Sequence, residues 1–325
     1  MDKPRLAYID RLKGLGILWV VIGHFTIYPL EISDDMIRTI ASTFHVPLLF
    51  FLSGYVIHTP PYLLKALKKG VLFGLPCIVL SFLFGYLKGV GLSNVMFDGY
   101  KYGYWYLFVL ILFYIALSTF RLVLKAKRPF LLEFIIFTIF FIFFTSMRYL
   151  LPIKLSGLLS LDLCSLYWPV FVVGFWVRKY NVLSSFYKFN ILFTITLLGY
   201  IFFCLLAESY FLWLYRFAYI LSPFPFVYLF RFREKSGSLI ENELERFGRH
   251  SLDIYVYQYF ILWTGMISLP SVGCYFVSTH NYILEFILAL SYSVLVSYVS
   301  ILIGQIVRKS TLLNNLIYGA FVSKY

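Results

Sequence analysis

The sequence predicts an all-α, polytopic membrane protein of about ten transmembrane helices, with both termini in the cytoplasm. Three observations support this fold class. Hydrophobic residues make up 61% of the 325 residues and charged residues only 13%, about half the roughly 25% found in a soluble domain. Apolar runs of spanning length recur along the whole chain, and basic residues concentrate in alternate loops. Too few polar side chains remain to cover a water-exposed surface.

The spans follow one another closely along the chain. A spanning helix needs about 20 mostly apolar residues. The first apolar run has a charged stretch before it but no small-residue cleavage site after it, so we expect a retained helix and not a signal peptide. The loops are short, and residues 1–325 are expected to form a single domain. The ten predicted spans are residues 14–30, 44–60, 71–88, 104–120, 129–147, 162–177, 189–207, 210–230, 251–269 and 281–306.

Two kinds of segment depart from this simple pattern. Prolines near positions 152, 223 and 270 mark helices that are expected to be broken or re-entrant. In the longest cytoplasmic loop, the charged residues 241–246 are expected to form a short interfacial helix.

The distribution of basic residues supports the orientation. With the N-terminus inside, six regions become cytoplasmic, and they hold 22 of the 28 Lys and Arg residues. Cytoplasmic loops of membrane proteins carry such an excess. The same bias explains the net charge of +13, so no nucleic-acid partner is inferred.

The cysteines suggest neither a metal site nor a disulfide framework. Cys77, Cys164, Cys204 and Cys274 lie far apart, within or beside apolar runs. No CxxC motif and no Cys/His metal spacing occurs in the sequence.

The first span contains the strongest candidate for chemistry. An ionisable side chain inside a span costs roughly 2.5–3.5 kcal/mol or more at its centre, so His24 needs a reason to be there: catalysis, or a bond to a neighbouring helix carbonyl. Lys13 lies eleven residues earlier, about 20° short of the same face and roughly 16 Å below. Lys13 either binds an anion or is a snorkelling anchor. Asp10, three residues before Lys13, is placed to pair with it or orient it.

The second span supplies candidate supporting residues. Ser53 follows His45 by eight residues, about 12 Å along a helix that runs inward, which is expected to bring Ser53 and Gly54 near the depth of His24. The Ser53 hydroxyl would then orient the imidazole, or the Ser–Gly pair is simply a packing notch. His45 is either a second acid/base or, as we favour, an interfacial residue.

These residues resemble the acyltransferase-3 family of integral membrane O-acyltransferases, which includes the fucose 4-O-acetylase-like proteins. Residues 9–14 through His24 look like the family's opening motif, a basic residue followed by ten residues and then His. Lys13 stands where many members have Arg. Residues 45–48 and 50–55 resemble the second-helix signature.

The resemblance continues along most of the chain. Many members carry His three residues after the position of Tyr255, whereas this chain has Gln258, so an acid/base role there is in doubt. The later segments similar to family motifs are residues 65–69 with Pro76, 105–107, 170–174 and 247–255.

The resemblance implies an O-acetyltransferase with no bound cofactor. It would move an acetyl or similar acyl group from cytoplasmic acyl-CoA, with acetyl-CoA as co-substrate, to a sugar hydroxyl of a cell-surface or lipid-linked glycan. It implies a multi-pass protein of a bacterial inner or plasma membrane, surrounded by lipid, with polysaccharide biosynthesis proteins as candidate partners.

The resemblance also suggests roles for individual residues. His24 would act as general base or accept the acyl group covalently. Lys13, Lys65, Lys68 and Lys69 would bind CoA phosphates, although cytoplasmic topology alone also explains the last three. Trp105 would stack on a sugar, although a membrane-belt position is the favoured interpretation.

Two other function classes remain open from the sequence. A glycan or small-molecule transporter would also have about ten helices with intramembrane polar residues, but the chain lacks the paired halves with interrupted helices common in transporters. The third class is a non-catalytic partner of a polysaccharide synthase.

Overall fold

The computed structural model describes residues 6–32, 36–57, 59–123, 130–183, 190–209, 214–232, 237–263 and 268–321. Every regular element within these ranges is helical, which confirms the predicted all-α fold. The chain divides into two compact units. Unit 1 consists of Met1–Val56 and Val173–Gly304, and unit 2 of Ile57–Val172 and Gln305–Tyr325.

Five of the described helices are long and apolar enough to cross a membrane: α2 (Met36–Tyr55), α3 (Leu63–Leu87), α6 (Phe130–Leu150), α8 (Leu161–Lys179) and α16 (Tyr282–Lys309). The protein is therefore a multi-pass membrane protein. Helix α1 (Ala7–Ile27) has spanning length as well, but Asp10, Arg11 and Lys13 lie in its first half. This difference matters for the site, because α1 carries the candidate histidine.

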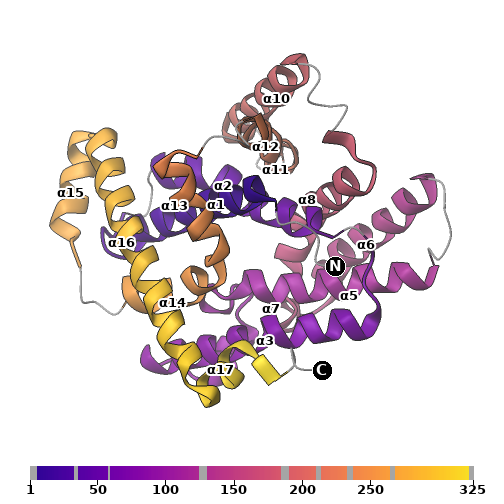
Figure 1. The fold of residues 1–325 in the computed structure, drawn as a ribbon, viewed down its shortest axis with the longest axis horizontal. Helices are drawn as coiled ribbons and strands as arrows, with labels where there is room; N and C mark the ends of the chain where they lie inside the picture. Colours follow the sequence, from indigo (N-terminus) through magenta and orange to yellow (C-terminus); the bar gives the residue numbers. More distant parts are fainter. Residues whose placement is uncertain are drawn as a thin grey trace. The chain divides into compact units, whose positions relative to one another are not determined.

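Unit 1 contains α1, α2, the end of α8 and most of α16. Figure 1 shows α1, in indigo, beside the orange α13, although the two are far apart in the sequence. The other helices of this unit are α10 (Asn190–Ser209), α11 (Tyr215–Leu221), α12 (Pro223–Phe232), α13 (Leu239–Arg249), α14 (Ser251–Trp263) and α15 (Pro270–Thr279).

Unit 2 has a core of aromatic side chains between its helices. The Trp168 ring of α8 contacts the rings of Phe113, Phe137 and Phe171 at centroid distances of 5.2–6.0 Å. Its short helices are α4 (Leu92–Phe97), the 3₁₀ turn η1 (Lys101–Gly103), α7 (Ile153–Leu158) and α17 (Thr311–Tyr318), and α5 (Trp105–Val123) packs on α3.

Proline breaks one predicted span. The expected helix over residues 210–230 is instead α11 and α12, seven and ten residues long, with Pro223 as the first residue of α12. Proline has no N–H to continue the hydrogen-bond ladder. Each half is shorter than the roughly 20 residues that a span requires, which confirms the break expected near Pro223. Residues 210–213 of this predicted span lie outside the described residues. The predicted span at residues 251–269 includes 264–267, which lie outside the described residues.

Candidate functional site

The candidate site is built on α1, which runs without a break from Ala7 to Ile27. Lys13 and His24 therefore lie on one helix, about 16 Å apart along its axis at 1.5 Å per residue. Both side chains are half-buried. The helix divides into a charged N-terminal half and an apolar half that contains the imidazole.

Two consecutive residues of α14 contact the two nitrogens of the His24 ring. His24 Nδ1 lies 3.3 Å from Gln258 Oε1, and the Tyr259 hydroxyl lies 3.3 Å from His24 Nε2. The Gln258 amide nitrogen donates to the Tyr255 carbonyl at 3.3 Å. Gln258 is fully buried and Tyr259 is 2% exposed. The imidazole is thus held by side chains of another helix and not by a helix carbonyl.

Aromatic rings surround the imidazole toward the end of α1. The Tyr259 ring lies 4.8 Å from the His24 ring and the Tyr28 ring 5.8 Å from it, between centroids. Tyr28 in turn stacks on Trp263, with centroids 4.9 Å apart and planes at 15°. Beside His24, a Cβ added to buried Gly23 would meet no atom within 4 Å. Aromatic rings thus contact the imidazole, and space for a further group lies beside the neighbouring Gly23.

The stagger of α1 and α2 corrects one expectation from the sequence. A Cβ added at Gly16 would lie 3.0 Å from the Leu49 side chain, so these residues share a level. His24 is eight residues farther along α1, and Ser53 is one turn past Leu49 in the opposite direction because the helices are antiparallel. Ser53 and Gly54 are therefore not at the depth of His24, and Ser53 Oγ donates to the Leu49 carbonyl at 2.8 Å. The physical reason is the close helix contact at Gly16, which fixes the stagger.

The far end of α2 has a polar cluster of its own. The hydroxyls of Tyr8 and Tyr55 lie 2.9 Å apart, and Arg178 Nη1 donates to the Tyr55 hydroxyl at 3.4 Å. Helix α8 can approach α2 this closely because Gly174 has no side chain. A Cβ at this position would overlap the Phe51 carbonyl. This cluster joins three helices within unit 1 at the end that carries the charges.

His45 has a different environment from His24. Its Nδ1 hydrogen-bonds the Ala41 carbonyl of its own helix. This bond is local, unlike the cross-helix contacts of His24. The His45 carbonyl lies 3.7 Å from a Cβ added at Gly16, so His45 lies level with the middle of α1, which gives no support to the interfacial interpretation.

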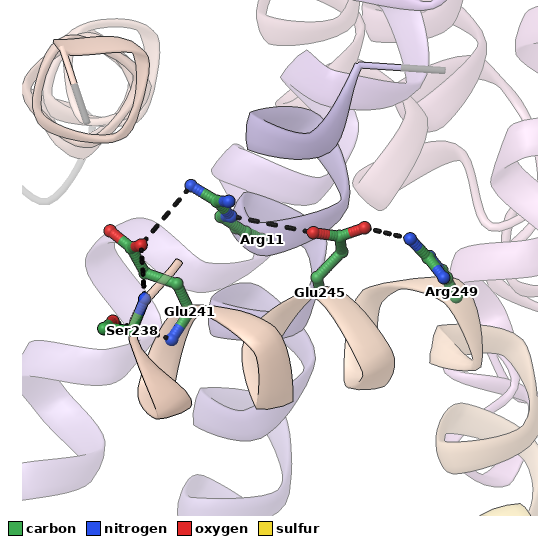
Figure 2. A network of polar contacts seen from close by, with 5 residues as sticks. All are labelled: Arg11, Ser238, Glu241, Glu245 and Arg249. Atoms are coloured by element: carbon green, nitrogen blue, oxygen red, sulfur yellow. Dashed lines mark hydrogen bonds and ion pairs between the residues drawn. The ribbon is translucent and has the colours of Figure 1, made fainter. Parts of the chain in front are cut away.

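Helix α13 locks onto the charged half of α1 through Arg11. Arg11 Nη1 lies 3.6 Å from Glu241 Oε2, and its Nε lies 3.8 Å from Glu245 Oε2. Glu245 also pairs with Arg249. Figure 2 shows this network, with Ser238 capping the start of α13. Because the Arg11 side chain is only 6% exposed, the pairs are largely desolvated.

Two glycines allow the backbones of α1 and α13 to touch. A Cβ at Gly14 would overlap the Leu244 carbonyl, and a Cβ at Gly248 would overlap the Asp10 carbonyl. Asp10 itself is 3% exposed. The helix expected at residues 241–246 exists, but it packs against α1 through its buried face instead of lying free at the membrane surface.

The sequence contained one signal for this contact that was missed. Ser238 and Glu241 are spaced as a capping box, in which each side chain bonds the other residue's backbone N–H. This pattern marks the start of α13. Arg11 lies in the segment that resembles the family's opening motif, but no sequence pattern indicated that it pairs with Glu241 and Glu245.

The segment resembling the late family motif packs equally closely. His250 Nδ1 lies 3.1 Å from Asp253 Oδ2, and the Asp253 carboxylate rests against Gly304 of α16, where any Cβ would overlap it. Asp253 is 1% exposed. This motif therefore joins α13, α14 and α16, and so supports the helix that carries Gln258.

The lysines expected to bind the donor's phosphates lie in unit 2. Lys65 is exposed, Lys68 is half-buried, and Lys69 Nζ donates to the Tyr114 hydroxyl at 3.2 Å while lying over that ring. Lys69 thus links α3 to α5, whereas Lys65 has the more accessible ammonium group.

Trp105, the expected sugar-stacking residue, also lies in unit 2. Its ring stacks on Tyr167 with centroids 5.4 Å apart, and Tyr100 contacts it edge-on at 6.4 Å. Trp105 is half-buried at the start of α5, in an aromatic cluster that suits a membrane belt as well as a ligand platform.

A family model described as an acyltransferase domain matches residues 6–302. This match covers most of the chain, which therefore belongs to the acyltransferase-3 family. The protein is accordingly a membrane acyltransferase. Neither the comparison with curated proteins nor that with solved structures returned a match.

Proposed function

We propose that the protein is an O-acetyltransferase that moves an acetyl or similar acyl group from cytoplasmic acyl-CoA to a sugar hydroxyl of a cell-surface or lipid-linked glycan. The observation that carries the proposal is the geometry of His24, an imidazole within the matched residues 6–302 whose two ring nitrogens both contact side chains of α14. An intramembrane imidazole held at both ring nitrogens is suited to proton transfer, because its orientation is already fixed.

The proposed chemistry uses His24 as general base. A sugar hydroxyl is a poor nucleophile near neutral pH, and removal of its proton by a positioned base accelerates attack by about 10²–10⁴-fold. The hydroxyl oxygen bonds to the acyl carbonyl carbon, the carbon–sulfur bond breaks, and the CoA sulfur leaves as thiol with the proton that His24 received. The aromatic wall of Tyr28 and Trp263 supports an acceptor sugar near the ring, since sugars stack on flat apolar faces.

Lys13 is proposed to attract the donor phosphates with Asp10 beside it, from the cytoplasmic half of the same helix. An ammonium group acts on phosphate as a point charge. Lys13→Arg is expected to keep activity, whereas Lys13→Ala should raise the apparent KM for acetyl-CoA without changing the melting temperature. An unchanged KM in Lys13→Ala would make Lys13 a snorkelling anchor.

The proposal includes about ten membrane crossings, both termini in the cytoplasm and a bacterial inner or plasma membrane as the location. The support is the distribution of basic residues. In a cysteine-free background, Ser278→Cys should react with an impermeant reagent on intact cells. Asn181→Cys should react only after permeabilisation. The reverse pattern would overturn the orientation.

The decisive experiment measures transfer of labelled acetyl groups from acetyl-CoA to alkyl glycosides by purified protein in lipid nanodiscs. His24→Ala should lose at least about 100-fold in turnover per folded molecule, and wild-type activity should fall on acidification because a protonated imidazole cannot act as base.

A matched control is Thr26→Val, which removes another buried polar group from the same region of α1. Within the described part of the chain, the Thr26 hydroxyl bonds its own helix, donating to the Gly23 carbonyl at 3.0 Å, so this variant should keep wild-type turnover. Substantial turnover in folded His24→Ala would refute the mechanism, and absence of labelled product from wild-type protein would favour a transporter or a non-catalytic partner.

A further inference from the structure

We propose that Gln258 is a positioning residue that fixes the tautomer of His24, so that Nε2 is the nitrogen that accepts the proton from the acceptor hydroxyl. This inference rests on the proposed function, because it assigns a role within the same site. The sequence alone showed Gln258 only as a departure from the family pattern, in which many members carry His, and gave no reason to expect a contact with His24.

The orientation of the Gln258 amide follows from its own bonds. Its nitrogen donates to the Tyr255 carbonyl at 3.3 Å, one turn earlier on α14. The amide oxygen therefore faces His24 Nδ1, at 3.3 Å. A flipped amide would place two acceptors, its oxygen and the Tyr255 carbonyl, against each other. An amide oxygen can only accept hydrogen bonds, so Nδ1 must carry the hydrogen.

The tautomer follows directly. A neutral imidazole has one N–H and one lone pair, and with Nδ1 protonated the lone pair lies on Nε2. The Tyr259 hydroxyl, 3.3 Å from Nε2, is a donor that matches this assignment. Two residues that are adjacent in the sequence thus specify opposite roles for the two ring nitrogens.

The Nε2 lone pair is the position that an acceptor hydroxyl must reach. In the transfer step, the acceptor's proton moves to Nε2 as its oxygen bonds to the acyl carbon, and the Tyr259 hydroxyl gives up this hydrogen bond. The imidazolium then carries both protons, with the Nδ1 proton still bound by Gln258. The Nε2 proton leaves with the CoA sulfur as the carbon–sulfur bond breaks.

Burial explains why both ends of the Gln258 amide need hydrogen-bond partners. Gln258 is fully buried in α14, where an amide without hydrogen-bond partners would be strongly destabilising. Both ends of the amide are used, one on its own helix and one on His24. A histidine at this position would titrate, whereas an amide oxygen remains an acceptor at every pH.

The test compares Gln258→Leu and Gln258→Glu with wild type in the acetyl-transfer assay, in nanodiscs, with kcat and KM per folded molecule. Gln258→Leu should lower kcat at least about tenfold, as expected when a histidine loses its orienting partner, with the KM for acetyl-CoA unchanged. In Gln258→Glu, a carboxylate would stabilise the imidazolium, so the acid limb of the pH profile should move to higher pH. A role confined to packing would not move that limb.

Groups around the imidazole that also titrate or carry charge stay constant in these variants. They are Tyr28 directly after α1, Tyr259 on α14, and His45 and Arg38 on α2. Nitrogen-15 NMR of histidine-labelled protein gives a readout independent of turnover. The wild-type His24 signals should show protonated Nδ1, and Gln258→Leu should weaken that signature.

Ile254→Val is the matched control, because Ile254 is a fully buried residue of the same helix and the change removes one methylene without touching a polar group. It should lower stability slightly and leave kcat unchanged. Wild-type kcat in folded Gln258→Leu, or an Nε2–H tautomer in wild-type protein, would overturn the inference. If His24→Ala abolishes transfer while Gln258→Leu does not, only this inference fails. If His24→Ala remains active, the proposed function fails first.

Discussion

The two ends of α1 are held in different ways. The N-terminal half is held against α13 by Arg11 and its two glutamates, with backbones in contact at Gly14 and Gly248. The half that contains His24 has two hydrogen bonds of 3.3 Å and open space beside Gly23. Buried ion pairs and backbone contact fix the position of one half, whereas the other half has space beside it in which a ligand could lie.

This difference indicates a division of labour along one helix. The half that makes close contacts serves as scaffold, and its residues should affect stability more than turnover. The half beside the open space should affect turnover more than stability. Positions on rigid elements hold reacting groups most accurately, so the scaffold half is what allows His24 to be positioned at all. Four substitutions test the comparison.

The largest loss of stability is expected from Arg11→Ala. Removing Arg11 would leave the buried charges of Glu241 and Glu245 uncompensated. Breaking a buried ion pair in this way costs about 3–5 kcal/mol of stability. Unfolding in denaturant, followed in detergent, measures the loss. Arg249→Ala is the matched control, since its pair with Glu245 is half exposed and such pairs contribute about 1 kcal/mol or less. Wild-type stability in Arg11→Ala, together with a raised KM for acetyl-CoA, would move Arg11 from scaffold to donor site.

Gly248→Ala should come next. The added methyl would overlap the Asp10 carbonyl, and forced overpacking of this kind costs about 1–3 kcal/mol. The melting temperature should fall while turnover per folded molecule changes little. A stability equal to wild type would show that α1 and α13 do not touch as described.

Ser238→Ala removes the side chain that caps α13. Its hydroxyl accepts from the Glu241 N–H at 3.3 Å, and loss of such a cap costs about 1 kcal/mol. Ser238→Asp should restore most of the stability, because Asp is an equally good cap. Failure of Asp to restore it would mean that the serine acts through another contact.

Gly23→Ala should have the smallest effect on stability, and with the opposite sign. The methyl meets no atom within 4 Å, and alanine is favoured over glycine in a helix by about 0.8–1.0 kcal/mol. The melting temperature should stay equal or rise. Larger residues, as in Gly23→Leu, should reduce turnover if the acyl group or acceptor uses this space. Full turnover in a stable Gly23→Leu would assign the space no role in catalysis.

The comparison also separates what could be predicted from the sequence. The all-helical membrane fold followed from composition and from runs of apolar residues, because a bilayer requires each span to satisfy its own backbone groups. His24 and Lys13 followed from the cost of placing charged or polar groups in a span. Their common helix is confirmed, whereas their chemical roles stay predictions.

The errors came from contacts between helices. Ser53 was expected beside His24 from helix lengths alone, but the contact of Gly16 with Leu49 sets a different stagger. Gln258 was noted only as a departure from a family pattern, and its bond to His24 joins residues on helices at opposite parts of the chain.

By itself, the sequence determined the class of protein, the helices as elements and the one histidine most in need of an explanation. These depend on local composition and on the solvent that surrounds the chain. The tertiary structure alone decided which side chains face His24 and which residue anchors Arg11. Helix periodicity specifies the face on which a residue lies but not the neighbour it meets, because the stagger and pairing of helices are set by side-chain packing between distant segments.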